Sequence, residues 1–440
     1  MILILFKFFL INLFALFILF IIQRIIQRKL KNQHNLQHGK NTKVITFMHP
    51  NCYDFGGGEK VLWMIIDALT SMKNAKCYYK INILCAPKLN KNTNNELTYN
   101  ENLLNRLKER FSIDINKNSE IIRSIEMIEF KTTKYLSPFP FFTMLLQILF
   151  QILFAFEICF RVHSDTIIDT VGLPFTFSIL KYLGRFKLSA YVHYPFISQD
   201  MVDDIKRGID GVHSRGVLAK YKIYKKLKLF YYNLILRFYK INLSCLEFMF
   251  TNSTWTYTHL KNIAPAVKNQ ILYPPCSIST YRNKNRNVQR ENIIISFAQF
   301  RPEKNQKMQL NILKEVRKRL PHINIRLCLM GGVRNEDDKK LFDNLKDYAE
   351  SLGLTNFVEF HPNLPSSEVK KKFESAKIGI HTMRDEHFGI SVIEMMSAGL
   401  LTIAHNSAGP KKDIIGASRS AVGFLSDGNI IKFFKKIFLF

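Results

Sequence analysis

The sequence predicts an α/β protein built from two parallel, doubly wound units that follow one another along the chain. Three observations lead to this fold class. The chain has 440 residues, a length that accommodates about two domains. In its second half, short apolar runs alternate with helical runs, which is typical of a parallel sheet covered by helices. In its first half, a glycine-rich turn joins the first predicted strand to the first predicted helix, where the backbone can approach a phosphate closely.

Composition narrows the classes of partner. The hydrophobic fraction of 47% is enough to form hydrophobic cores. The chain is strongly basic, with 63 Lys and Arg against 35 Asp and Glu. A basic excess suits either nucleic acid or an anionic membrane surface, and no nucleic-acid recognition module accompanies it, so we expect no nucleic-acid partner. The seven cysteines are scattered without a Cys-x-x-Cys pair. That pattern favours a reducing compartment and argues against a disulfide framework or a zinc site.

The N-terminus predicts a membrane anchor. Residues 1–22 are almost wholly apolar, broken only by Lys7 and Asn12, and are long enough to span a bilayer. They lack a positive leading region and a small-residue cleavage site, so an uncleaved anchor is preferred over the alternative, a cleaved secretory signal. Four cations follow at once: Arg24, Arg28, Lys29 and Lys31. By the positive-inside rule, the bulk of the chain then faces the cytosol.

Residues 43–275 are predicted to form an N-terminal domain. A first strand over 43–49 leads through a loop ending in Gly56-Gly57-Gly58 to a helix over 59–69. The loop spacing is neither Gly-x-Gly-x-x-Gly nor a Walker motif, so ordinary turn formation explains it equally well when it is taken alone. The polar stretch 88–118 is expected at the periphery. Further strands are predicted at 80–86, 166–169, 188–193 and 247–252.

Two segments of this domain are candidates for membrane contact. Residues 139–156 are apolar and long enough for a span in principle. A second span would place the two halves of the chain on opposite sides of the membrane, so we expect a membrane-associated helix that lies in the interface or is buried in the domain. Residues 219–238 predict a helix in which lysines alternate with aromatic residues. A membrane-surface face and an ordinary packed helix with a solvated basic side both explain that helix.

The second half of the chain is divided into a polar linker over 276–292, a C-terminal domain over 293–428 and a short basic-apolar tail over 429–440. Because strands and helices alternate in the domain, we expect a parallel sheet and a ligand cleft between the two domains. Its strands are predicted at 293–297, 323–330, 357–360, 378–382 and 401–404, with helices such as 306–319 and 337–352.

Candidate ligand-binding residues follow two of the predicted strands. His193 ends the strand over 188–193, while Arg301 and Lys304 follow the strand over 293–297. Open α/β sheets bind ligands at the carboxyl ends of their strands, and two cations there suit an anionic ligand. Non-functional alternatives exist: His193 could be a structural histidine, and Arg301 and Lys304 could be ordinary surface charges on a loop.

A strand-to-helix junction carries two glutamates, Glu386 and Glu394, eight positions apart. Gly389 begins an apolar run that should turn helical, and Gly399 can end that helix in a left-handed cap. Glu386 then lies on the loop before the helix and Glu394 on its second turn. The free amides of the helix start suit a diphosphate, and a neighbouring carboxylate can bind sugar or ribose hydroxyls. A capped helix with one surface and one packing glutamate explains the same pattern.

Taken together, these motifs resemble the retaining family 4 glycosyltransferases. The resemblance is carried by the Glu386-x7-Glu394 spacing, the Arg301-Pro-Glu-Lys304 segment and the Gly56-Gly57-Gly58 loop, and it runs from about residue 43 to residue 424. The family implies the GT-B fold, in which two Rossmann-like domains with parallel sheets face each other. Here an N-terminal transmembrane helix would be added.

The longer matches are similar to one branch of this family. That branch transfers α-1,2-linked mannose from GDP-mannose to a dolichyl-diphosphate-linked trimannosyl oligosaccharide in N-glycan precursor assembly. It implies location in the endoplasmic reticulum membrane, catalytic domains facing the cytosol, and other glycosyltransferases of the pathway as candidate partners. Alternatives are a family member with a different nucleotide-sugar donor or lipid acceptor, and a non-enzymatic basic protein that binds lipid or RNA. The matching segments are His49-Pro-Asn-Cys52, Tyr191-Val-His-Tyr-Pro-Phe-Ile-Ser198, Asn252-Ser-Thr-Trp255, Tyr273-Pro-Pro-Cys276 and Ala404-His-Asn-Ser-Ala-Gly-Pro-Lys411.

The family also implies roles for individual residues. The catalytic pair would be His193, lining the acceptor side near the reacting carbon, and Glu386, contacting hydroxyls of the donor sugar. Retention would proceed by front-face attack, with the leaving diphosphate helping to take the acceptor proton, so that neither a carboxylate nucleophile nor a metal or other cofactor is required. Many members carry an arginine two positions before Arg301, where this chain has Gln299. The donor-binding residues would be Arg301 and Lys304 at the diphosphate, Glu394 at the ribose, and Gly57, Gly58, Phe388, Gly389, Ile390 and Ser391 in the loops around the donor.

Overall fold

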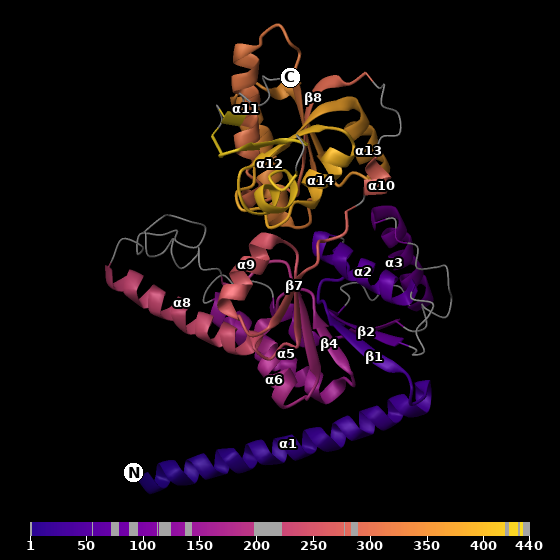
Figure 1. Ribbon diagram of the computed structural model, residues 1–440, viewed down its shortest axis with the longest axis vertical. Helices are drawn as coiled ribbons and strands as arrows, with labels where there is room; N and C mark the ends of the chain where they lie inside the picture. Colours follow the sequence, from indigo (N-terminus) through magenta and orange to yellow (C-terminus); the bar gives the residue numbers. More distant parts are fainter. Residues whose placement is uncertain are drawn as a thin grey trace.

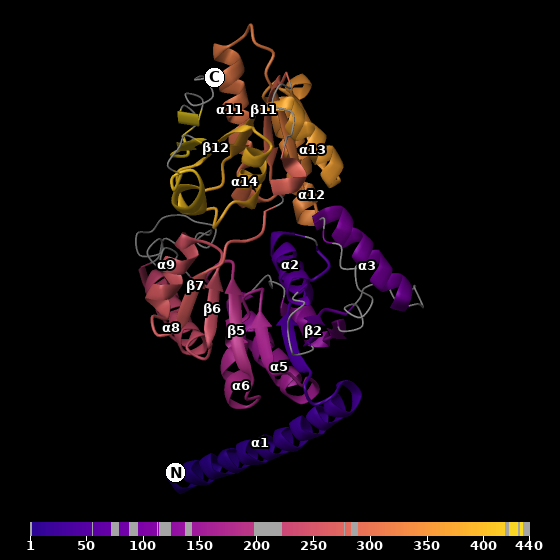
Figure 2. The same cartoon turned by 45° about the vertical axis from the view of Figure 1, so that its right-hand side comes forward.

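The computed structural model consists of two parallel sheets covered by helices, with a long N-terminal helix beside the first sheet (Figure 1). Turning the molecule shows the two units stacked along the longest axis, with the N-terminal helix at the far end from the C-terminal unit (Figure 2). The structure describes residues 2–54, 56–71, 79–87, 96–111, 113, 125–136, 143–197, 222–276, 278–282, 289–418, 422–429 and 432–433.

The N-terminal sheet has seven parallel strands in the order β3-β2-β1-β4-β5-β6-β7. Five of them lie where strands are predicted from the sequence, whereas β3 and β7 are not predicted. Both are edge strands whose side chains are mostly half-buried or exposed, so their apolar pattern is weak. In chain order the strands are β1 (Lys43–Met48), β2 (Tyr79–Cys85), β3 (Ile125–Glu129), β4 (Thr166–Asp169), β5 (Lys187–Val192), β6 (Phe248–Thr251) and β7 (Lys268–Ile271).

Helices cover both faces of this sheet. One of them, α3, lies in the polar stretch that is expected at the periphery. Its Leu103 and Leu107 are instead buried in a core cluster with Phe47 and Leu62, because they repeat on one face of an amphipathic helix. The described part of that stretch is therefore an outer helix that contributes these two side chains to the core (Figure 1). The helices are α2 (Gly57–Ser71), α3 (Glu96–Phe111), α5 (Thr143–Arg161), α6 (Phe177–Tyr182), α8 (Lys222–Leu243) and α9 (Thr254–Ile263), with short 3-10 turns η2 (Lys131–Leu136) and η3 (Pro174–Thr176).

The N-terminal helix α1 (Ile2–His38) contains the predicted anchor and continues beyond it. Its second half packs on the end of α5, where Gln27 Nε2 donates to the carbonyls of Cys159 and Val162 at 2.9 and 2.8 Å. Nearer the N-terminus, Phe14 and Phe17 are exposed. The helix therefore leaves the domain with apolar side chains facing outward.

Helix α5 overlaps the second apolar segment. One side, including Phe154 and Ile158, is buried in the core of the domain, while Leu145 and Leu149 are exposed on the other. Among the described residues, one helical segment, residues 144–161 of α5, is long and apolar enough to cross a membrane. The burial of one face shows that this helix is also part of the folded domain.

The C-terminal sheet has six parallel strands in the order β10-β9-β8-β11-β12-β13. Short β13, at one edge, is not predicted from the sequence. The chain enters this sheet from β7 through the short helix α10 (Ile278–Tyr281). The strands are β8 (Glu291–Phe297), β9 (Arg326–Gly331), β10 (Val358–Pro362), β11 (Ala376–His381), β12 (Leu401–His405) and β13 (Phe424–Ser426).

Four helices pack on the C-terminal sheet, and the residues of α11, α12 and α14 agree closely with the sequence prediction. Phe433, within the predicted tail, is buried in the core of this domain. Contacts also join the two domains: the carboxylate of Asp413 accepts hydrogen bonds at 3.0 Å from the Thr254 amide and the Tyr273 hydroxyl. The helices are α11 (Gln306–Arg319), α12 (Glu336–Ser351), α13 (Ser366–Ser375) and α14 (Ile390–Ser397), with short turns η5 (Pro302–Lys304), η6 (Thr355–Phe357) and η7 (Pro410–Ile414).

Candidate active site

A cavity of about 850 Å³ lies between the two domains. Its walls are the loops that follow the strands of both sheets, so the carboxyl ends of the strands face each other across it. The N-terminal wall contains the glycine loop after β1 and His193 after β5. The C-terminal wall contains Lys304 after β8 and the segment from Glu386 to Ser391 after β11.

The glycine loop is held in place by a buried network. Glu59 reaches back over the first turn of α2 and accepts a hydrogen bond from the Gly56 amide at 2.5 Å, which is the capping-box arrangement. Its other oxygen lies 3.5 Å from His49 Nε2, and His49 Nδ1 lies 2.8 Å from the Thr170 hydroxyl. Burial would raise the pKa of the Glu59 carboxyl, but the contact with His49 outweighs it and the pKa is lowered. The sequence analysis assigned no role in the site to Glu59 or His49.

A side chain at position 56 would meet two charged groups. An added Cβ would lie 2.0 Å from Arg334 Nη2 and 2.7 Å from Glu59 Oε2, so a side chain would displace both charged groups. Gly57 and Gly58, which are predicted donor-binding residues, line the cavity. Added Cβ atoms there would face Ile390 Cδ1 at 3.6 Å and His193 Nε2 at 3.7 Å. Both glycines thus lie against predicted residues of the site.

His193 is half-buried, and its Nε2 atom is enclosed without a hydrogen-bond partner among the residues that the structure describes. Burial lowers the pKa of His193 to about 4. The imidazole is therefore neutral near pH 7. A neutral ring can donate a hydrogen bond to a hydroxyl or accept one from it.

Glu386 lies on the loop before α14, as the sequence predicts. Its Oε2 atom is 2.5 Å from Lys304 Nζ and 3.1 Å from His381 Nε2. Burial alone would raise the pKa of the Glu386 carboxyl, but the Lys304 ammonium and the His381 contact outweigh burial and hold this pKa well below its usual range. The structure thus brings Glu386 and Lys304 together as a partly buried ion pair that faces the cavity.

The start of α14 has the geometry of a helix N-terminus that suits an anion. Gly389 is the N-cap, with φ of +111°, a conformation that favours glycine. The amides of Ile390 and Ser391 follow in the first turn, where a helix leaves its N–H groups without intrahelical partners. Phe388 is buried and stacks on Tyr273 with ring centroids 5.3 Å apart. All four predicted residues of this loop, from Phe388 to Ser391, line the cavity.

Glu394, on the second turn of α14, is buried at the same cavity. Its Oε1 atom lies 3.0 Å from the ammonium of Lys60, which belongs to α2 of the other domain. Both side chains are less than 10% exposed. Lys60 was not identified in the sequence analysis, because the lysine and glutamate are 334 positions apart.

Arg301 is not among the residues that line the cavity. It begins the turn η5 with an extended backbone, and its guanidinium Nε lies 3.8 Å from Asp338 on α12. Gln299, two positions earlier, does line the cavity. The structure thus separates the two cations that the sequence analysis paired, and only Lys304 faces the space where a donor would lie.

An aromatic contact between the domains was also missed. The ring of His387 lies 4.3 Å from Tyr194 and 5.5 Å from Trp255, both in the N-terminal domain. Burial lowers the pKa of His387 to about 4, so this ring is neutral near pH 7 as well. The position of His387 beside Glu386 in the sequence was the signal that could have found it.

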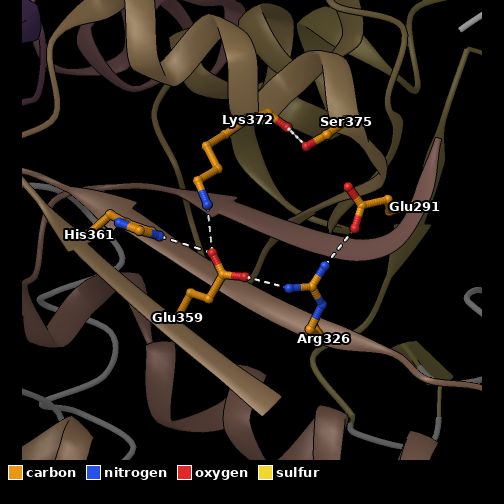
Figure 3. Close-up of polar contacts among 6 residues, drawn as sticks. All are labelled: Glu291, Arg326, Glu359, His361, Lys372 and Ser375. Carbon is orange, nitrogen blue, oxygen red and sulfur yellow. Dashed lines mark hydrogen bonds and ion pairs between the residues drawn. The ribbon is translucent and has the colours of Figure 1, made fainter. Parts of the chain in front are cut away.

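One group of side chains away from the cavity has metal-ligand types. Cys328, Glu359 and His361 bring their ligand atoms within 4.8 Å of one another on β9 and β10. Glu359 already accepts from Arg326 at 3.0 Å, Lys372 at 2.6 Å and His361 at 3.0 Å (Figure 3). Three side chains already donate hydrogen bonds to the Glu359 carboxylate. We therefore interpret the group as an ion-pair network between the sheet and α13.

Comparison with known families decides the identity of the chain. Residues 42–264 match the family described as ALG11 mannosyltransferase N-terminus, and residues 277–437 match the family described as glycosyl transferases group 1. The chain belongs to the ALG11 mannosyltransferase family. The two matches meet near the passage from the first sheet to the second, so both walls of the cavity come from the matched regions.

Several members of the ALG11 family are similar along most of the chain. A human protein named GDP-Man:Man(3)GlcNAc(2)-PP-Dol alpha-1,2-mannosyltransferase is 34% identical over 417 residues, covering 92% of this chain and 81% of the human protein. The protein of the same name from Xenopus laevis is 36% identical, with 93% and 82% covered. That from Dictyostelium discoideum is 32% identical, with 87% and 74% covered.

Solved structures show the fold. Sucrose-phosphate synthase from Thermosynechococcus elongatus superposes with a TM-score of 0.62 at 12% identity, covering 90% of this chain and 89% of that one. Anabaena HepE in complex with UDP and glucose gives a TM-score of 0.55 at 14% identity, with the same coverage. Together with the two facing parallel sheets, these likenesses confirm the predicted GT-B fold. The family matches show that the chain is a glycosyltransferase, and the solved structures show that its fold is GT-B.

Proposed function

We propose that this member of the ALG11 family is a retaining α-1,2-mannosyltransferase. It moves mannose from GDP-mannose to the dolichyl-diphosphate-linked trimannosyl oligosaccharide of N-glycan precursor assembly. The observation that carries the proposal is the 34% identity to the human enzyme of that name across 92% of the chain, which includes both walls of the cavity.

The cavity has the features that a nucleoside diphosphate sugar needs. Its volume of about 850 Å³ lies in the range of small-molecule sites. The Lys304 ammonium and the first amides of α14 would bind the diphosphate, because both offer positive charge at the same wall. Glu394 would accept hydrogen bonds from the ribose, and Glu386 from hydroxyls of the mannose. The glycine loop of the other domain would close over the sugar.

The charges of the site favour front-face attack over a covalent intermediate. The charge of Glu386 is balanced by Lys304, and a carboxylate held in this way is a better hydrogen-bond acceptor than a nucleophile. The attacking acceptor hydroxyl would pass its proton to an oxygen of the leaving diphosphate. Neutral His193 would orient that hydroxyl at the reacting carbon. In this scheme side chains and amides supply the positive charge, and no metal ion or other cofactor takes part.

Exposed apolar side chains support a membrane-bound acceptor. Phe14 and Phe17 on α1 and Leu149 on α5 are exposed. Helix α8 adds a further apolar stripe that includes Leu227 and Phe230, each 66% exposed, and contains no acidic residue. Such surfaces suit insertion into the interface of an anionic bilayer. We place the chain at the endoplasmic reticulum membrane, anchored by α1, with the catalytic domains in the cytosol and other glycosyltransferases of the pathway as partners.

The test is a transfer assay with purified full-length protein in detergent. Radiolabelled GDP-mannose is supplied with a synthetic lipid-diphosphate trimannosyl acceptor, and the products are sized and digested with an α-1,2-mannosidase. Up to two added mannoses that this mannosidase removes are expected. UDP-glucose and UDP-N-acetylglucosamine, offered in parallel, should give no product. Transfer from either UDP-sugar, or folded protein that neither binds GDP-mannose nor transfers from it, would refute the proposal.

A complementary test uses cells that lack this mannosyl step. Expression of the chain should convert the accumulated trimannosyl lipid to longer species, as measured by sizing of the lipid-linked glycans. The Glu394→Ala variant, expressed at the same level, should leave the trimannosyl species in place. Equal conversion by both would show that Glu394 does not take part.

A further inference from the structure

Lys60 joins the two domains at the nucleotide end of the cavity. The salt bridge between Lys60 and Glu394 links a residue of the N-terminal domain to one of the C-terminal domain. The Lys60 side chain is 9% exposed and that of Glu394 is 7% exposed. Two charges this deeply buried are stable only as a pair, because each would lose its hydration without a partner.

The position of Lys60 follows from local structure. Gly56 caps α2, Glu59 turns back to bond the Gly56 amide, and Lys60 is the next residue of the helix. The Lys60 amide is bonded to the Gly56 carbonyl at 3.0 Å, so the lysine backbone is fixed to the glycine loop. Any movement of that loop therefore carries the ammonium towards or away from the facing domain.

The ion pair leaves part of Glu394 available. Lys60 Nζ approaches Oε1, while Oε2 receives no hydrogen bond from any residue that the structure describes. The contact with Lys60 thus fixes the direction of the carboxylate, and one oxygen remains for a ligand hydroxyl. This is the arrangement expected where an acceptor must be oriented before a ligand arrives.

We infer that Lys60 is a positioning residue for the donor: it orients Glu394 for the ribose and couples binding of the nucleotide to closure of the two domains. The inference goes beyond the proposed function and rests on it, since it takes the ribose of a GDP-sugar as the ligand of Glu394. In this role Lys60 acts through Glu394.

The first experiment measures the dissociation constant of GDP by calorimetry. Lys60→Met should weaken binding at least tenfold, and Lys60→Arg, which keeps the charge, should stay within threefold of the wild type. The matched control is Lys80→Met, which breaks an ion pair with Glu126 in the same domain but outside the cavity. That control should bind GDP as the wild type does. Folded Lys60→Met protein that binds GDP within twofold of the wild type would overturn the inference.

A double variant separates positioning from stability. Lys60→Met leaves the Glu394 charge buried without its partner and should lower the melting temperature. Lys60→Met/Glu394→Gln removes that charge as well, so it should recover the melting temperature while binding GDP no better than Glu394→Gln alone. If the two substitutions instead weaken GDP binding by the product of their separate effects, the residues act independently and the inference fails.

A readout without nucleotide distinguishes failure of the inference from failure of the proposed function. In the ligand-free protein, Lys60→Met should speed hydrogen exchange in the first turn of α2 and in α14 together, because the contact between them is lost. The Lys80→Met control should leave both segments protected. Unchanged exchange in α14 would overturn the domain-coupling inference even if the wild type binds no GDP. Faster exchange in Lys60→Met, combined with a wild-type protein that binds no GDP, would refute the proposed donor alone.

Discussion

Replacement of Lys304 with methionine removes the cation from the partly buried pair with Glu386. The two side chains are 18% and 14% exposed, so little water can replace the lost ammonium. Removing one member of such a pair costs about 3 kcal/mol, because the remaining charge keeps only the His381 contact among the residues that the structure describes. At roughly 2–4 °C per kcal/mol for a domain of this size, the melting temperature should fall by about 6–12 °C.

The same substitution should also slow transfer. If Lys304 binds the diphosphate, its loss removes a charge that stabilises the leaving group, and kcat should fall by about 100-fold or more. Lys304→Met/Glu386→Gln should recover most of the melting temperature, since no charge is left unpaired, without recovering kcat. The assays are differential scanning fluorimetry and transfer from radiolabelled GDP-mannose, run on the same protein preparations.

The matched control is Lys372→Met, which breaks another ion pair of the C-terminal domain. Lys372 lies 2.6 Å from Glu359 in the network of Figure 3, away from the cavity. It should lower the melting temperature but leave kcat and the KM for GDP-mannose unchanged. If Lys304→Met loses stability yet keeps wild-type kcat, the assignment of Lys304 to the leaving group is wrong. An equal loss of kcat in the Lys372 control would show that the effect comes from general destabilisation.

Three further results are expected. The pKa of His193 and that of His387 lie at about 4 in the folded protein, below the ordinary value near 6.5. Between pH 6.5 and pH 4 the unfolded chain therefore binds more protons than the folded protein, and the free energy of unfolding falls as the pH drops. From pH 7 to pH 5 the loss is about 2 kcal/mol for each ring, and the His387→Phe variant should show a smaller fall in melting temperature over that range than the wild type. Gly56→Ala places a methyl group against Arg334 and Glu59, so the rate of transfer from GDP-mannose should drop at least tenfold. The far-ultraviolet circular dichroism spectrum should stay native. Normal activity would show that the position of the loop is not critical. Arg301→Ala should change the KM for GDP-mannose less than threefold, because this guanidinium faces Asp338; a loss comparable to that of Lys304→Met would mean that Arg301 turns into the cavity when donor binds.

Much of the fold follows from local patterns in the sequence. The central strands of both sheets are continuous apolar runs because both of their faces are covered, and the sequence analysis finds them. Gly389 and Gly399 bound a short apolar helix, as the sequence predicts, and the positive φ of Gly399 agrees with the predicted left-handed cap. The edge strands β3, β7 and β13 were missed, because one-sided or short strands lack that apolar signal.

The sequence by itself determined which side chains follow the strand ends, and so it placed His193, Lys304, Glu386 and Glu394 in one candidate site. Only the tertiary structure decided how these groups are paired and charged. Lys60 meets Glu394 from 334 positions away because two separate helix starts face each other across the cavity, and no local pattern encodes that contact. The low pKa of His193 likewise arises from enclosure by both domains, and such burial is a property of the assembled cavity.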